Sequence, residues 1–152
     1  MTALLETPDW SGSLAGLSVR VGCDVVALAE IERSLDRFGE RFLRRVFAES
    51  ELRECVGVTR VESLAARFAA KEAVIKAFAA PDLAIALTDI AVSRTAAAPT
   101  LALTGDAASC AREQGWIQTS VSLSHTDCHA MATVAVLCRS QSTEDAVSSP
   151  GM

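Results

Sequence analysis

The spacing of apolar residues along the chain changes several times, and each change predicts a different secondary-structure element. Apolar and other residues alternate over 19–23, which predicts a strand that runs into Asp24. Residues 27–56 have a helical spacing that is interrupted at Gly39 and again near Ala48. The first part of the chain is therefore predicted to be one strand followed by a broken run of helices.

The strongest helical pattern covers 61–80, and Pro81 ends it. A later helix is predicted over 106–114, with Thr104 or Asp106 as its N-cap. Further strands are predicted over 88–94, 99–105, 118–124 and 130–137. The order of strand, helices, two strands, helix and two strands indicates a domain of the α+β class.

The two ends differ from this patterned region. Residues 1–17 contain proline and glycine with little periodicity, so we expect an irregular N-terminal extension. Residues 139–152 are polar and rich in serine, which predicts a flexible C-terminal tail. The chemistry is therefore expected within a single domain over 18–138.

The composition argues against several classes of function. The chain has 152 residues, a net charge of −5 and no tyrosine, which does not suit a nucleic-acid binder. No apolar stretch approaches the roughly 20 residues that cross a bilayer, and the first residues do not form a secretory signal. The five cysteines are scattered without a CxxC spacing, which suits free thiols in a reducing compartment. We therefore expect a cytoplasmic protein that binds neither nucleic acid nor membrane.

The helix over 61–80 carries charged residues although two of its sides are apolar. Glu72 and Lys76 border its main apolar stripe, and Arg67 lies between apolar residues of the far face. Glu72 and Lys76 have the spacing of an ordinary surface ion pair, worth about 0.3–0.5 kcal/mol. The same groups would hold a divalent cation and a phosphate side by side if a second carboxylate joined them. The helix alone does not decide between these interpretations.

Asp24 and His125 are the polar residues that would complete such a site. Asp24 follows an apolar strand, where it is either the second carboxylate or a cap for the next helix. His125 lies where a strand becomes a turn, although a turn histidine can simply bond to the backbone. A zinc site of His125, Cys128 and His129 would crowd three ligands into five residues without a fourth. A hydrolase triad around His125 would lack a nucleophile elbow.

Three segments taken together give a more specific signal. They are VGCDVVALAEIERSLDRFGERFLRRVFAESEL (21–52), SLAARFAAKEAVIKAF (63–78) and VSLSHTDCHAMATVAV (121–136). In this order they resemble the short bacterial holo-[acyl-carrier-protein] synthases of the 4′-phosphopantetheinyl transferase superfamily, from about residue 19 to 138. The resemblance implies the fold of that superfamily, with a small antiparallel sheet packed on a long central helix and shorter helices around it.

The resemblance also implies roles for individual residues. Asp24 and Glu72 match magnesium ligands, and Lys76 matches a lysine that contacts the pyrophosphate of coenzyme A. Arg67 and His125 match residues that hold the phosphorylated end of coenzyme A. The residues expected to bind coenzyme A are thus Arg67, Lys76, His125 and Thr126. The residues expected to act in catalysis are Glu72, Lys76 and His125.

The implied reaction is attack by a serine hydroxyl of an acyl or peptidyl carrier protein on the β-phosphate of coenzyme A, which releases 3′,5′-ADP. A homotrimer with active sites at subunit interfaces is also implied. The general base stays open between Glu72, acting through a water on the metal, and a water near His125. A second hypothesis is a catalytically silent paralogue that binds coenzyme A or a carrier protein as a regulatory or assembly module. Retention of Asp24, Glu72, Lys76 and His125 favours the active enzyme.

Some positions depart from the pattern of the family. Glu30 stands where the family has an arginine that meets the carrier protein. Arg33, Arg37 and Arg41 would form a compensating basic stripe, or simply a solvated helix face beside neighbouring acidic residues. Residues 79–84 (AAPDLA) replace a Gly-rich turn of the family. The choice of carrier protein is therefore the least determined part of the resemblance.

Overall fold

The computed structural model describes residues 16–80, 82–94 and 98–139. The predicted extension and tail lie outside these ranges, apart from the few residues that adjoin the domain. Within the described chain, no helix is both long enough and apolar enough to cross a membrane. From the N- to the C-terminus the elements are β1 (Leu17–Ala27), α1 (Leu28–Phe38), α2 (Glu40–Val46), α3 (Glu49–Glu54), α4 (Arg60–Phe78), a 3-10 turn η1 (Leu87–Asp89), β2 (Ile90–Arg94), β3 (Pro99–Leu103), α5 (Gly105–Glu113), β4 (Trp116–His125) and β5 (His129–Arg139).

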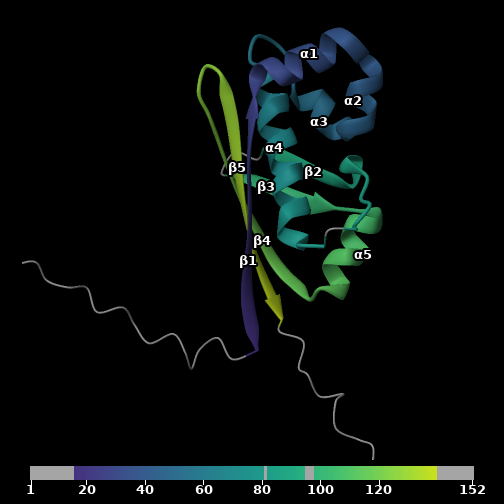
Figure 1. The fold of residues 1–152 in the computed structure, drawn as a ribbon, viewed down its shortest axis with the longest axis vertical. Helices are drawn as coiled ribbons and strands as arrows, with labels where there is room; N and C mark the ends of the chain where they lie inside the picture. Colours follow the sequence, from purple (N-terminus) through teal and green to yellow (C-terminus); the bar gives the residue numbers. More distant parts are fainter. Residues whose placement is uncertain (1–15, 81, 95–97, 140–152) are drawn as a thin grey trace, which may run out of the picture.

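The strands form two antiparallel sheets beside the long helix α4. One sheet has the order β1-β5-β4, and the other is the β2-β3 hairpin. Figure 1 shows α4 running alongside the longer sheet, with α1, α2 and α3 at one end of the molecule and α5 toward the other. The prediction of an α+β domain with a small antiparallel sheet on a long central helix is confirmed.

The core lies between α4 and the longer sheet, and small residues let the two approach closely. Alanines 65, 69, 70 and 73 of α4 are fully buried. Gly22 of β1 lies against the α4 backbone at Ala73 and Ala77, and a Cβ added there would lie 1.8 Å from the Ala73 carbonyl oxygen. Only glycine fits at that position, because any side chain would collide with the backbone of the helix. The Gly22–Ala73 contact therefore sets the spacing between sheet and helix.

One of the two predicted helix N-caps needs correction. Strand β1 continues past Asp24 to Ala27, and Ala27 is the N-cap residue of α1, so Asp24 is not a helix cap. Pairing with β5 extends the strand, because the Asp24 backbone lies opposite Ala132 in the sheet. At α5 the prediction of Thr104 as N-cap is confirmed, although its side chain makes no capping hydrogen bond. The cap comes instead from Asp89, whose carboxylate accepts from the Asp106 N–H at 3.1 Å. Asp89 lies far from α5 in the sequence, so this cap could not be read from the local pattern.

The opposite face of the longer sheet is open in the single chain. Alternate residues of β1 point away from α4, and Val19, Val21 and Val25 are 62%, 61% and 57% exposed. Met131 of β5, which lies opposite Val25, is also exposed. Such an apolar sheet face is unusual for the surface of an isolated domain.

Candidate active site

Asp24 and Lys76 form an ion pair between β1 and α4. The Lys76 ammonium donates to Asp24 Oδ1 at 2.8 Å and to the Cys23 carbonyl oxygen at 2.9 Å. The hydrogen bond to Asp24 raises the pKa of Lys76, so the lysine stays charged. Its side chain is 54% exposed, which leaves one of its three N–H groups open to a ligand.

Glu72 lies one helical turn before Lys76 and completes this group. Burial raises the pKa of Glu72, and the negative charge of Asp24 raises it further, while Lys76 partly offsets both effects. Two carboxylates thus lie close enough to repel each other, beside an ammonium that already pairs with Asp24. The interpretation of Glu72 and Lys76 as an isolated surface pair does not describe this arrangement, because Asp24 is the partner of Lys76.

The Asp24 and Glu72 carboxylates are suited to a divalent cation. Both supply hard oxygen donors, and a bound cation would relieve the repulsion between them. The described ranges contain no cluster of three or more His, Cys, Asp or Glu side chains with metal-binding geometry. A two-carboxylate site fits magnesium, which commonly leaves its other positions to water and substrate phosphate.

Arg67 and His125 lie together at a different place, on a cavity of about 550 Å³ between α4, β4 and the β2-β3 hairpin. Arg67 is only 2% exposed, whereas His125 is exposed at the end of β4. Arg94 also lines this cavity. Glu62 lines it as well, but two guanidinium groups and an imidazole outnumber this one carboxylate and make the cavity suited to an anionic ligand such as a phosphate.

Thr126 has a local role in the turn that follows His125. Its hydroxyl oxygen accepts from the His129 N–H at 3.1 Å and from the Cys128 N–H at 3.4 Å. Its own backbone N–H donates to the His129 carbonyl oxygen at 2.8 Å. These bonds hold the turn in shape and thereby fix the end of β4 from which His125 projects.

Within one chain the predicted site residues therefore form two groups. Arg67 precedes Glu72 by five residues, which places the two side chains about 140° apart around α4. Strand β5 separates the strand of Asp24 from the strand of His125, a distance of about 10 Å across the sheet. We call Asp24, Glu72 and Lys76 the carboxylate group, and Arg67, Arg94 and His125 the basic cavity.

Two acidic residues of α3 escaped the prediction from sequence. Glu51 pairs with Lys71 at 2.7 Å, and both side chains are fully buried. Glu54 pairs with Arg67 at 2.6 Å. The sequence did contain a signal for them: Arg67 and Lys71 lie on a largely apolar helix, and cations that become buried there require acidic partners. Which acids supply those partners depends on how α3 packs against α4.

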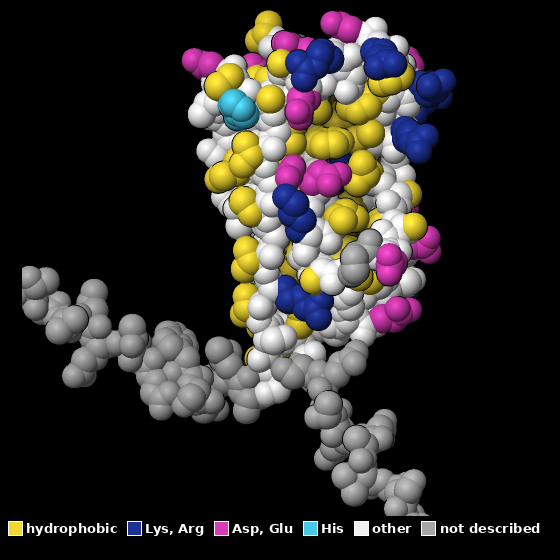
Figure 2. Space-filling view, in the orientation of Figure 1, with side chains coloured by type: hydrophobic (Ala, Val, Ile, Leu, Met, Phe, Trp, Pro, Cys, Tyr) yellow, Lys and Arg dark blue, Asp and Glu magenta, His cyan; other side chains and the backbone are white. Residues whose placement is uncertain are grey.

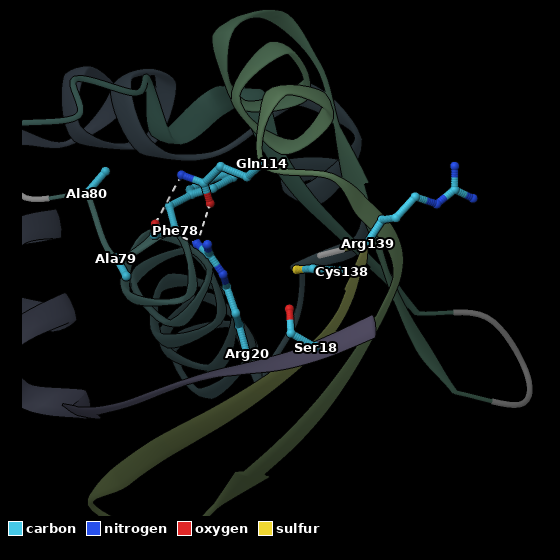
Figure 3. A pocket seen from close by; sticks show the side chains of 8 residues that line it. All are labelled: Ser18, Arg20, Phe78, Ala79, Ala80, Gln114, Cys138 and Arg139. Carbon is cyan, nitrogen blue, oxygen red and sulfur yellow. Dashed lines mark hydrogen bonds between the residues drawn. The ribbon is translucent and has the colours of Figure 1, made fainter. Parts of the chain in front are cut away.

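A second cavity, of about 450 Å³, lies at the C-terminal end of α4 (Figure 3). The Arg20 guanidinium bridges the Phe78 carbonyl oxygen at 3.1 Å and the Gln114 side-chain oxygen at 2.7 Å. The Arg139 side chain points away from the cavity. Arg20 thus caps the last turn of the helix that carries Lys76, which is a structural role.

Comparison with known proteins identifies the family. A family model described as "4'-phosphopantetheinyl transferase superfamily" matches residues 20–133. Holo-[acyl-carrier-protein] synthase of Gloeobacter violaceus is 40% identical over 121 residues, covering 78% of this chain and 92% of that protein. Its counterpart in Anaeromyxobacter sp. (strain K) is 43% identical over 118 residues, covering 75% and 91%. The chain therefore belongs to the 4′-phosphopantetheinyl transferase superfamily, as the sequence predicted.

Solved structures agree with this assignment. The ACPS–CoA complex of Chronobacterium ammoniagenes has a TM-score of 0.70 and 31% identity, covering 82% of this chain and 98% of that one. The Helicobacter pylori holo-[acyl-carrier-protein] synthase in complex with coenzyme A has a TM-score of 0.65 and 31% identity, covering 76% and 98%. The predicted phosphopantetheinyl transferase fold is thus confirmed.

Proposed function

We propose that this chain is a holo-[acyl-carrier-protein] synthase, which transfers 4′-phosphopantetheine from coenzyme A to a serine of an apo carrier protein. The serine oxygen forms a bond to the β-phosphorus as the bond between that phosphorus and the bridging oxygen breaks, and 3′,5′-ADP leaves. The convergence of Asp24, Glu72 and Lys76 carries the proposal. Phosphoryl transfer needs positioning and charge neutralisation, which such a group can supply.

Asp24 and Glu72 would hold Mg²⁺, which neutralises charge on the phosphate oxygens when it is bound. Lys76 keeps one N–H for a pyrophosphate oxygen while Asp24 and the Cys23 carbonyl fix its position. A carboxylate has two oxygens, so Glu72 can hold the cation with one of them and accept a proton through water with the other. We assign Glu72 the role of receiving the serine proton, through water, as the oxygen attacks.

The basic cavity would bind the phosphorylated end of coenzyme A. Arg67 and His125 face this cavity from different elements. Because the carboxylate group lies elsewhere on the same chain, we propose that a complete site combines the carboxylate group of one subunit with the basic cavity of the next. The open apolar face of the sheet, with Val19, Val21 and Val25 exposed, supports such an assembly, which we propose is a homotrimer.

The first helices would receive the carrier protein. Figure 2 shows Lys and Arg side chains gathered at one end of the molecule, over α1 and α2. The exposed arginines of these helices are Arg33, Arg37, Arg41, Arg44 and Arg45. Local positive charge would steer an acidic carrier toward a protein whose net charge is −5. The five free cysteines support a reducing, cytoplasmic setting.

A mass measurement tests the transfer directly. The protein is incubated with coenzyme A, Mg²⁺ and several apo carrier proteins, and each carrier is weighed by mass spectrometry. Addition of one phosphopantetheine to a carrier, lost when Mg²⁺ is chelated, is the expected result. Binding of coenzyme A without any gain in carrier mass would contradict transfer and favour the silent-paralogue hypothesis.

Mixing two inactive variants tests whether the site is shared between subunits. E72Q damages only the carboxylate group, and H125A damages only the basic cavity. In mixed oligomers some interfaces would combine an intact group from each variant, so we expect part of the transfer activity to return after the two are unfolded and refolded together. Refolding each variant alone is the control. No recovery in a mixture that forms trimers by light scattering would contradict a shared site.

A further inference from the structure

Two buried cations of α4 differ in how many of their donors remain free. The Lys71 ammonium has three N–H groups, and it contacts Glu51 and the carbonyl oxygens of Leu87 and Ile90. All of its donors are therefore engaged. Lys71 fastens α4 to its neighbours and has nothing left with which to bind a ligand.

Arg67 has donors left. Its Nε donates to the Val92 carbonyl oxygen at 3.3 Å, and Nη1 donates to the Ser63 carbonyl oxygen at 3.4 Å. Its Nη2 donates to Glu54 Oε2 at 2.6 Å. A guanidinium has five N–H groups, so two remain for which the described part of the chain supplies no acceptor. Arg67 lines the basic cavity, where those two can meet a ligand.

Glu54 makes the shortest of these contacts. The same carboxylate oxygen accepts the Arg94 backbone N–H at 3.3 Å, so the last turn of α3 is linked to both α4 and β2. The two carbonyl contacts of Arg67 are long, and on their own they hold the guanidinium plane weakly. A short charge-assisted bond is stronger and directional. Glu54 is therefore the group that fixes how Arg67 presents its free donors.

We propose that Glu54 is a positioning residue for coenzyme A binding, acting through Arg67. This inference rests on the proposed function. Glu54 holds the guanidinium at the edge of the cavity so that a phosphate finds two N–H groups already oriented. Without Glu54 the arginine would have to be ordered at each binding event, which weakens binding of coenzyme A more than it slows the chemical step.

Kinetics of E54A and E54Q in the full-length protein test the proposal. E54A should raise KM for coenzyme A by about tenfold, with a smaller change in kcat. E54Q keeps a neutral acceptor for Arg67 and should recover a large part of the loss. The matched control is E49A, because Glu49 lies on the same helix and pairs with Arg53 at 3.3 Å on the surface. E49A should leave KM unchanged.

Combining E54A with R67A separates positioning from a merely structural role. If Glu54 acts through Arg67, E54A should add nothing to the KM of R67A. An equal increase in both backgrounds, or a lowered Tm with KM unchanged, would overturn the proposal. Should E54A fail to fold, E54M replaces it, because methionine keeps the length of the side chain without an oxygen acceptor for Arg67. A wild-type KM in E54M would then overturn the proposal.

Direct binding of coenzyme A distinguishes this inference from the proposed function. Isothermal titration of wild-type, E54A and E49A proteins needs no carrier protein and no turnover. Weaker binding by E54A alone would support Glu54 even if the wild-type protein transferred nothing, and only the proposed function would then fail. No binding by the wild-type protein would overturn both.

Discussion

Lys71 and Lys76 lie five residues apart on the same helix, and the difference between them separates structure from chemistry in this protein. Each donates to a carboxylate oxygen at nearly the same distance, 2.7 Å to Glu51 and 2.8 Å to Asp24. The first pair is fully buried, and burial lowers the pKa of Lys71. The second pair is partly exposed, and Asp24 raises the pKa of Lys76.

The N–O distance of an ion pair therefore does not show whether the pair serves stability or catalysis. Burial and unused donors are what distinguish the two lysines. Lys71 donates all three of its N–H groups, to Glu51 and to two backbone carbonyls, so its removal leaves buried acceptors without partners. Lys76 donates two N–H groups, to Asp24 and to the Cys23 carbonyl, and its third N–H group stays free beside the two carboxylates. The buried pair should therefore govern stability, and the exposed pair should govern transfer.

The largest expected effect is on stability, from K71M. Methionine fills a similar volume but leaves the Glu51 carboxylate buried without its cation, so we expect a loss of about 3–5 kcal/mol in the free energy of unfolding. Denaturant unfolding followed by circular dichroism measures it. The double variant E51L/K71M should recover only part of the loss, because Glu51 also accepts the N–H groups of Ala48 and Val92.

K76M is the matched control on the same helix. It should lower the free energy of unfolding much less than K71M does, because water can reach the two carboxylates that lose the ammonium. Its transfer activity should fall by about tenfold or more. A K71M protein as stable as K76M would contradict the distinction between the two lysines.

The next effect is on transfer, from D24N and E72Q. Each removes one carboxylate charge while preserving shape, so either should lower kcat/KM by at least about 100-fold. Neither should destabilise the fold by more than about 1 kcal/mol. Each change relieves repulsion between the two carboxylates, and D24N weakens only a partly exposed ion pair with Lys76. The mass gain of the carrier protein over time gives the rate, and thermal unfolding gives the stability. Wild-type rates in either variant would exclude a magnesium site at these residues.

The smallest effect is a dependence of stability on pH. Burial and Asp24 hold the pKa of folded Glu72 above its ordinary value of 4.5. A raised carboxyl pKa favours the protonated form on folding, so its contribution is fully present below about pH 4.5 and is lost as the pH rises through the folded pKa. Relative to E72Q, the wild-type protein should therefore lose stability as the pH rises from about 4.5 through the raised pKa of folded Glu72.

Chemical denaturation of both proteins at a series of pH values, without divalent cations, measures this difference. Adding Mg²⁺ at neutral pH should restore stability to the wild-type protein and not to E72Q. A difference that stays flat with pH, or one that grows in favour of the wild type, would contradict the raised pKa.

The sequence predicts much of this molecule because its strongest signals are local. Periodicity places α4 within about two residues, and the motif around Glu72 and Lys76 leads to Asp24 before any contact is known. It does not predict that β1 passes Asp24, because the end of that strand depends on pairing with β5. Nor does it identify the partners of Lys71 and Arg67, since these depend on how the short helix α3 packs.

Gly22 makes the carboxylate pair possible without touching a ligand. It lies on β1 two residues before Asp24, and its contact on α4 is Ala73, the neighbour of Glu72. A methyl group at residue 22 would collide with the backbone of α4 and push β1 and α4 apart next to the two carboxylates. A variant such as G22A would retain every chemical group of the proposed site, and we expect it to bind Mg²⁺ more weakly than the wild-type protein does.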